Sequence, residues 1–247
     1  MPVTAVRSSH NSKSKLVIVS IIALVILMTT LYILAHRTAK PAYDGPRPGF
    51  VYVKHLIPNI TLQLRYNSTD NFTGRKVAGY IQPVCILSMK ATLALEKVQK
   101  DLNQMGLGII VFDAYRPQQA VDSFVKWSKD YNDKKMKGQY YPDVAKKDLF
   151  PEGYIAAKSS HSRGSTVDLS IIDLKTGKKL DTGTGFDLFS KKSWPDYPGL
   201  ATQQRANRLL LRSLMTKHGF NPYPYEWWHF TLKNEPFKGT YFNFPVK

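Results

Sequence analysis

Two short stretches in the C-terminal half of the chain carry side chains that could hold one metal ion. His161 and Asp168 lie in the first stretch, and Glu226 and His229 lie in the second. Two imidazoles and one carboxylate are a common ligand set for catalytic zinc, which keeps a fourth position open for water. We expect the ligands to be His161, Asp168 and His229. Glu226, beside the last ligand, could then act as the base that deprotonates this water, so the pattern predicts a hydrolase.

The spacing within each stretch sets conditions on the fold. Gly164 and the alternating residues after it predict a loop from His161 that leads into a strand carrying Asp168. Glu226 and His229 are three residues apart and would face opposite sides of a regular strand, so the strand must start, bulge or twist between them. Each pair alone also occurs by chance, because a motif stays a hypothesis until its structural context is known.

Arg116 is the candidate for stabilising negative charge during a reaction. It follows an apolar run at 108–112 and precedes Pro117, where a helix can start, and binding residues often project from such junctions. Its guanidinium could face a carbonyl oxygen that becomes an oxyanion. The structural alternative is a salt bridge to Asp113, three residues earlier.

The elements that must position these residues follow from the hydrophobic pattern. Residues 88–105 and 201–217 show apolar side chains at helical spacing, each closed by a nearby glycine, and another helix is expected from Pro117 to about Tyr131. Strands are expected at 108–112, 166–174 and 228–232. Strands mixed with a few helices and hairpin turns predict an α+β fold, with a central antiparallel sheet flanked by helices.

The composition indicates one folded domain and argues against a nucleic-acid partner. The chain has 247 residues, and the segment 49–247 is long enough to form a single catalytic domain with a substantial core. Lys and Arg number 35 against 18 Asp and Glu, a formal charge of +17. These basic residues are scattered and form no stripe with stacking aromatics, so we expect no nucleic acid to bind. The single cysteine, Cys85, excludes an internal disulfide and the thiolate-rich zinc sites.

The N-terminal residues have the pattern of a targeting segment. Residues 16–35 are almost unbroken in apolar character, and about twenty such residues span a bilayer core. The basic residues within 1–15 favour a cytoplasmic N-terminus. We expect an uncleaved signal anchor, that is, one transmembrane helix, at 16–35, followed by a linker at 36–48. The catalytic domain would then be held at the inner membrane outside the cytoplasm, and the alternative is secretion after signal cleavage.

Several stretches resemble the D-alanyl-D-alanine dipeptidases of the VanX type, a family of zinc peptidases associated with vancomycin resistance. The resemblance extends over nearly all of the domain, from about Tyr52 to Lys247. The matching stretches are 70–74, 79–80, 113–117, 158–165, 185–187, 226–229 and 241–247. So many matches in the same order are more specific than any single motif.

The resemblance implies a role for each matching site residue. It implies one zinc ion per chain on the three ligands named above, with Glu226 as general base and later proton donor. Arg116 would position the scissile carbonyl and stabilise the tetrahedral intermediate. Four further residues are implied to bind the substrate. Asp187 and Tyr66 would bind its free amino terminus, and Ser159 and Tyr80 would bind its carboxylate. A carboxylate that binds the free amine would also explain a preference for dipeptides.

The expected function is hydrolysis of the free dipeptide D-alanyl-D-alanine to two D-alanines. The known resistance enzymes of this type act in the cytoplasm, whereas an export segment would place this site outside it. A role in cell-wall turnover or salvage is therefore expected. One alternative is a related D,D- or L,D-carboxypeptidase that trims peptidoglycan stem peptides. A second is a non-enzymatic, membrane-tethered wall-binding module with a structural zinc, and the presence of Glu226 counts against it.

Overall fold

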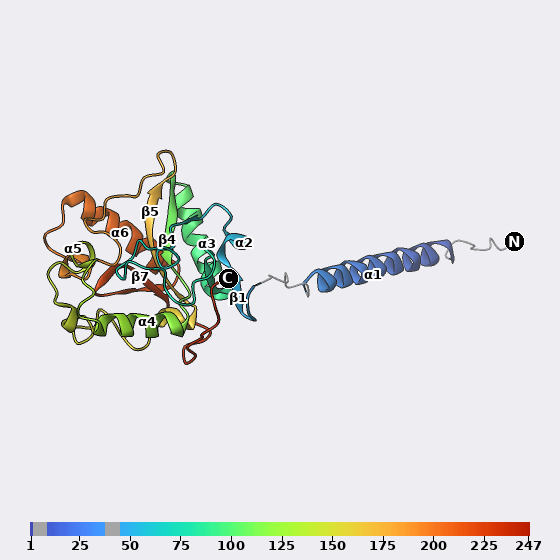
Figure 1. Ribbon diagram of the computed structural model, residues 1–247. Helices are drawn as coiled ribbons and strands as arrows, with labels where there is room; N and C mark the ends of the chain where they lie inside the picture. Colours follow the sequence, from blue (N-terminus) through green and yellow to red (C-terminus); the bar gives the residue numbers. More distant parts are fainter. Residues whose placement is uncertain (2–8, 38–44) are drawn as a thin grey trace. The chain divides into compact units, whose positions relative to one another are not determined.

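The computed structural model describes residue 1, residues 9–37 and residues 45–247, with the side chains of the first helix described for 17–32. The chain divides into two compact units, Met1–Tyr43 and Asp44–Lys247. The first unit contains the helix α1 (Ser9–Arg37), and the second contains the strands (Figure 1). The predicted linker at 36–48 falls largely on 38–44, outside the described residues.

The prediction of a transmembrane helix at 16–35 is wrong. Over residues 1, 9–37 and 45–247, no helix combines the length and the apolar character needed to cross a membrane. The single-pass attachment to the inner membrane, which was inferred from that helix, is therefore wrong as well.

The second unit is built on a five-stranded sheet with the strand order β2-β4-β5-β7-β6. Its strands are β2 (Thr61–Leu62), β4 (Leu107–Asp113), β5 (Thr166–Asp173), β6 (Phe220–Tyr223) and β7 (Glu226–Leu232). The sheet is mixed, because β2 runs parallel to β4 whereas the other neighbouring strands are antiparallel. The architecture is α+β, and the prediction of a purely antiparallel sheet is wrong at this edge.

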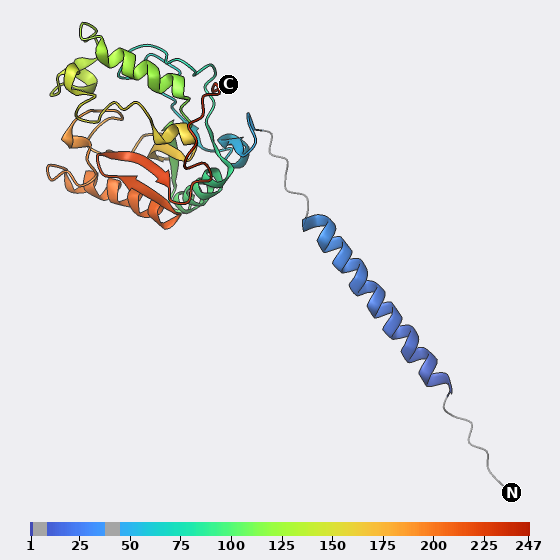
Figure 2. The same ribbon diagram turned by 90° about the horizontal axis from the view of Figure 1, so that it is seen from below.

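The parallel edge and the helical layers follow from the order of the elements. A second, two-stranded sheet pairs β1 (Phe50–Tyr52) with β3 (Ile86–Ser88), and β3 with the helix α3 (Met89–Asn103) forms the crossover that a parallel β2–β4 pair requires. Figure 2 shows α3 and α6 (Thr202–Lys217) together on one side of the five-stranded sheet and α4 (Gln118–Lys129) on the other. Short helices occur at α2 (Val53–Leu56), α5 (Lys137–Tyr140), η1 (Lys146–Asp148), η2 (Ser160–Arg163) and η3 (Lys191–Ser193).

The helix α3 illustrates how local sequence fixes these layers. Ser88 Oγ accepts a hydrogen bond from the backbone N–H of Ala91, which caps the helix start. Leu95 and Leu102 recur two turns apart and are fully buried on the face that packs toward β4. Gly106, with a φ of 70°, follows the helix end and lets the chain turn directly into β4.

Gly164 sets how closely the η2 turn can approach the strand β1. Its φ is 78°, and a methyl group at this position would overlap the ring of Phe50. We expect Gly164→Ala to lower the free energy of unfolding by roughly 1–3 kcal/mol more than Gly177→Ala, because overpacking costs about that much. Gly177 is a matched control, since its φ is 68° and no described atom lies within 4 Å of an added methyl group. Equal losses in chemical denaturation would contradict the close contact with Phe50.

Candidate active site

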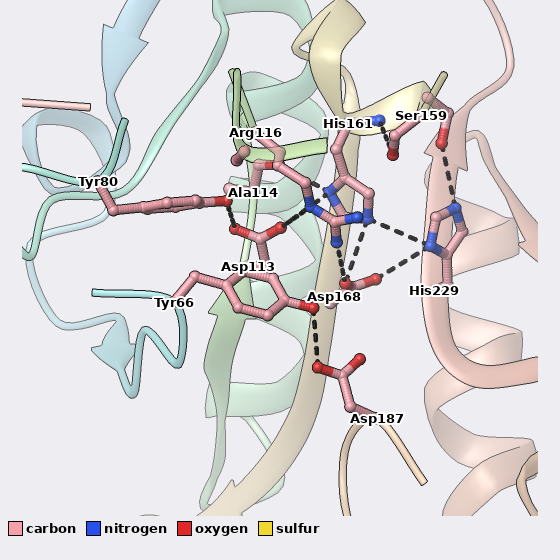
Figure 3. A network of polar contacts seen from close by, with 12 residues as sticks. Tyr66, Tyr80, Asp113, Ala114, Arg116, Ser159, His161, Asp168, Asp187 and His229 are labelled. Carbon is pink, nitrogen blue, oxygen red and sulfur yellow. Dashed lines mark hydrogen bonds and ion pairs between the residues drawn. The ribbon is translucent and has the colours of Figure 1, made fainter. Parts of the chain in front are cut away.

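Three neighbouring strands carry acidic and imidazole side chains to one place on the sheet. Asp168 on β5 pairs directly with His229 on β7, and Asp113 at the end of β4 pairs with Asp168 from the other side. Directly opposed residues of antiparallel strands project from the same face. The strand register therefore gathers these three side chains, which are far apart in the sequence, into the cluster that Figure 3 shows.

His161 reaches the same cluster from the η2 turn. Its Nδ1 donates a hydrogen bond to the carbonyl oxygen of Ala114, at 2.7 Å. A carbonyl can only accept, so this bond fixes the tautomer of the neutral ring and leaves a lone pair on Nε2. Nε2 lies 3.2 Å from Asp168 Oδ2 and 3.3 Å from His229 Nδ1. Burial lowers the pKa of His161, which favours the neutral form that a metal ligand must have.

The three side chains predicted as metal ligands are within reach of one ion. Donor atoms of His161, Asp168 and His229 all lie within 4.8 Å of one another. Asp168 Oδ1 is buried and accepts no hydrogen bond from the described residues, although His229 Nδ1 is 3.1 Å away. A cation would satisfy this oxygen, and a set of two imidazoles and one carboxylate suits zinc better than calcium or magnesium. The residues present therefore fit zinc.

Glu226 stands beside this ligand group because it is the first residue of β7. The register of the β6–β7 hairpin shifts between Pro222 and Tyr223, and Glu226 pairs with Tyr223. Its Oε2 lies 3.4 Å from His229 Nδ1. The irregular strand start that the three-residue spacing demands is present, and it brings the Glu226 carboxylate to the edge of the metal site.

The pKa values of Glu226 and Asp168 are shifted in opposite directions. Burial raises the pKa of Glu226 to about 7. Burial also acts upward on the pKa of Asp168, but the adjacent His161 and His229 outweigh it and hold that pKa below its usual range. Asp168 is therefore ionised, as a ligand must be, whereas Glu226 can take up and release a proton near neutral pH.

Arg116 makes the predicted salt bridge and also faces the cluster. Its Nε donates to Asp113 Oδ2 at 2.8 Å, and one terminal nitrogen lies 3.5 Å from Asp168 Oδ2. Asp113 is buried and accepts a second hydrogen bond from the Tyr80 hydroxyl, at 2.7 Å. The two interpretations of Arg116 are thus compatible, because the salt bridge holds the guanidinium with its far edge toward the candidate metal site.

The four residues implied to bind substrate do not all lie in one place. Asp187, Tyr66 and Ser159 line the same cavity as the cluster, which has a volume of about 450 Å³. Tyr66 Oη donates to Asp187 Oδ2 at 2.8 Å, and burial together with the charge of Asp168 raises the pKa of Asp187. Asp187 has a φ of 60°, a conformation that non-glycine residues adopt mainly where surrounding structure enforces it. Tyr80 is not among the lining residues and instead supports Asp113.

Sequence reasoning missed two features of this cavity. The sequence suggested Asp113 only as a salt-bridge partner of Arg116. In the structure Asp113 also accepts a hydrogen bond from the Tyr80 hydroxyl, and no sequence pattern predicts this contact. The aromatic wall beside Glu226 was also missed. Tyr223 packs its ring 5.2 Å from that of His229, and Tyr154 lines the cavity too. The Pro-Tyr-Pro-Tyr run just before Glu226 was the available signal for Tyr223.

A base that stands next to the ligands without joining them is typical of metal-dependent hydrolases, where it handles the proton of the attacking water. An arginine that faces the same centre is suited to the oxygen of a carbonyl under attack. Residues of the paired strands β5, β6 and β7 line the cavity, so the sheet positions these groups. By fold and site, this is a metallopeptidase.

Comparison with known proteins identifies the family. The D-ala-D-ala dipeptidase family model matches residues 47–247. A D-alanyl-D-alanine dipeptidase of Streptomyces coelicolor is 41% identical over 80% of this chain and 98% of its own length. One from Enterococcus faecalis is 38% identical over 80% of this chain and 98% of its own length. The chain therefore belongs to the D-ala-D-ala dipeptidase family, and its cofactor is zinc.

A solved structure is also similar, though more distantly. It is the crystal structure of the vancomycin-resistance D,D-pentapeptidase VanY in complex with Zn(II). The TM-score is 0.38 and the sequence identity 17%, over 63% of this chain and 77% of that chain. A likeness of this size adds nothing to the assignment above.

Proposed function

We propose that this enzyme hydrolyses the free dipeptide D-alanyl-D-alanine to two molecules of D-alanine. The observation that carries the proposal is the carboxyl group of Asp187, which shares one cavity with Glu226 and the candidate zinc ligands. Burial raises the pKa of this carboxyl group, and a free ammonium group would favour its ionised form by pairing with it, whereas an acylated nitrogen would not. The site is therefore suited to a substrate whose amino terminus lies close to the bond that breaks. The names of the relatives support the same substrate.

Glu226 and Arg116 would have different roles in the reaction, proton transfer and stabilisation of negative charge. Zinc, when bound, lowers the pKa of a water molecule and polarises the substrate carbonyl. Glu226 would accept the proton of the attacking water and later deliver it to the departing amine, and its pKa of about 7 suits both transfers. Arg116, held by Asp113, would donate to the carbonyl oxygen as negative charge develops on it. Loss of one such donor costs ~3 kcal/mol in the transition state.

The test is a panel of substrates given to the purified, metal-quantified protein. Products from D-alanyl-D-alanine, its N-acetyl derivative and a stem-peptide fragment ending in D-alanyl-D-alanine are identified by mass spectrometry. We expect rapid release of D-alanine from the free dipeptide alone. Preferential cleavage of the N-acetylated or longer peptide would instead support the D,D- or L,D-carboxypeptidase alternative and would refute this proposal.

Asp187→Asn tests the recognition of the amino terminus. Because a hydrogen bond to a charged group contributes about 1.5–3 kcal/mol, we expect kcat/KM for the free dipeptide to fall roughly 10- to 100-fold. Asp196→Asn is the matched control, since Asp196 is exposed and pairs with Arg212 outside the cavity. If the two variants hydrolyse the dipeptide equally well, Asp187 has no part in binding the ammonium group.

A further inference from the structure

The cavity is lined by three cationic side chains, and two of them already have carboxylate partners. Arg116 is paired with Asp113 and also lies near the candidate zinc ligand Asp168. Arg163 donates from Nε and from one terminal nitrogen to the two carboxylate oxygens of Glu235, each at 2.8 Å. A bidentate pair of this kind is among the stronger interactions that an arginine forms, so Arg163 is occupied.

Lys158 is the third cation, and it has no carboxylate partner in the part of the chain that the structure describes. Its Nζ lies 4.9 Å from the centre of the Tyr241 ring, which also lies beside Arg163. The side chain lines the cavity and is exposed to solvent. An aromatic face holds an ammonium group in place without neutralising its charge, so Lys158 remains available to an anion that enters the cavity.

The next residue supplies a hydroxyl to the same cavity. Ser159 Oγ accepts a hydrogen bond from the backbone N–H of His161, at 3.3 Å. Because its oxygen is used as an acceptor, the hydroxyl hydrogen is free to be donated to a negatively charged oxygen. Two consecutive residues therefore provide a positive charge, from the Lys158 ammonium group, and a hydrogen-bond donor, from the Ser159 hydroxyl.

The cavity also contains the carboxyl group of Asp187. Figure 3 shows Ser159 on one side of the His161 and Asp168 pair and Asp187 on the other. Asp187 and Lys158 line the same cavity, which therefore offers both a carboxyl group and an ammonium group. A short zwitterion such as a free dipeptide carries the complementary pair, an ammonium group and a carboxylate.

We propose that Lys158, together with the Ser159 hydroxyl, binds the C-terminal carboxylate of the substrate and selects peptides that end inside the cavity. This inference rests on the proposed function and adds to it a residue that binds the C-terminal end of the substrate. The sequence resemblance assigned that end to Ser159 and Tyr80, whereas the structure has Tyr80 hydrogen-bonded to Asp113 outside the cavity lining.

The experiment compares D-alanyl-D-alanine with its C-terminal amide, which lacks the negative charge. We expect Lys158→Met to lower the ratio of kcat/KM for the acid over the amide by roughly 10- to 100-fold, the range for a hydrogen bond to a charged group. Lys158→Arg should recover part of the ratio. In the wild-type enzyme the KM for the acid should rise with salt, more than it does in Lys158→Met, because the site is open to solvent.

Lys97→Met is the matched control, because Lys97 is an exposed lysine of α3 outside the cavity lining. A ratio that stays constant in Lys158→Met, whether both substrates are affected equally or neither is, would overturn the inference. Calorimetric binding of acid and amide to Glu226→Gln, with and without Lys158→Met, measures the same preference without turnover. Lys158 can therefore be tested even if the wild-type enzyme does not hydrolyse the dipeptide, a result that would refute the proposed function alone.

Discussion

Replacement of Glu226 by glutamine is expected to lower kcat for D-alanyl-D-alanine by roughly 10²- to 10⁴-fold, the range for loss of a general acid–base group. Glutamine has nearly the same shape but can neither accept the proton of water nor return it to the amine. Glu226 lies beside the ligand group, with Oε2 3.4 Å from His229 Nδ1. The variant should therefore keep its zinc and its fold, as measured by metal analysis and thermal unfolding.

A matched control separates this effect from a general change in charge. Glu96→Gln removes a carboxylate that pairs with Lys100 on the surface of α3, at 2.7 Å, where an ion pair contributes little. We expect its kcat to stay within about twofold of the wild-type value. A Glu226→Gln enzyme with full zinc content and near-normal kcat would show that another group moves the proton.

Much of the candidate site could be predicted because its residues lie in short, well-patterned segments. The alternation after Gly164 predicted a strand that carries Asp168, and β5 has that strand. The three-residue spacing of Glu226 and His229 required an irregular strand start, and the β6–β7 hairpin provides one. What the sequence could not give is the register, since the direct pairing of Asp168 with His229 depends on contacts between distant segments.

Other features depend on contacts between distant segments. The Tyr80 hydroxyl donates to the buried Asp113 of β4, a long-range contact that no local pattern encodes. The two-residue strand β2 is too short to show any periodicity, so its parallel pairing with β4 at the sheet edge could not be predicted from the sequence. At 16–35, the length of the apolar run and the basic residues before it were taken as evidence for a membrane span.

Changes to the ligand group should have the other large effect, on zinc binding itself. We expect Asp168→Asn and His161→Ala to weaken zinc binding by more than about 100-fold, because changes to supporting residues around metal sites already cost 10- to 100-fold. Hydrolysis should fall to background. Zinc should raise the midpoint of thermal unfolding of the wild-type protein, since a ligand that binds only the folded state stabilises it, and should raise that of the variants far less.

The control for these variants is another histidine with a carboxylate partner. His218 Nε2 lies 2.7 Å from Asp101 Oδ2, away from the cavity lining, so His218→Ala should keep stoichiometric zinc and the zinc-dependent rise in midpoint. The buried Asp168 Oδ1, which accepts no hydrogen bond from the described residues, gives the sharpest expectation. If Asp168→Asn bound zinc as tightly as the wild-type protein, that oxygen would not be a ligand, and the metal would have to be held by a different set of residues.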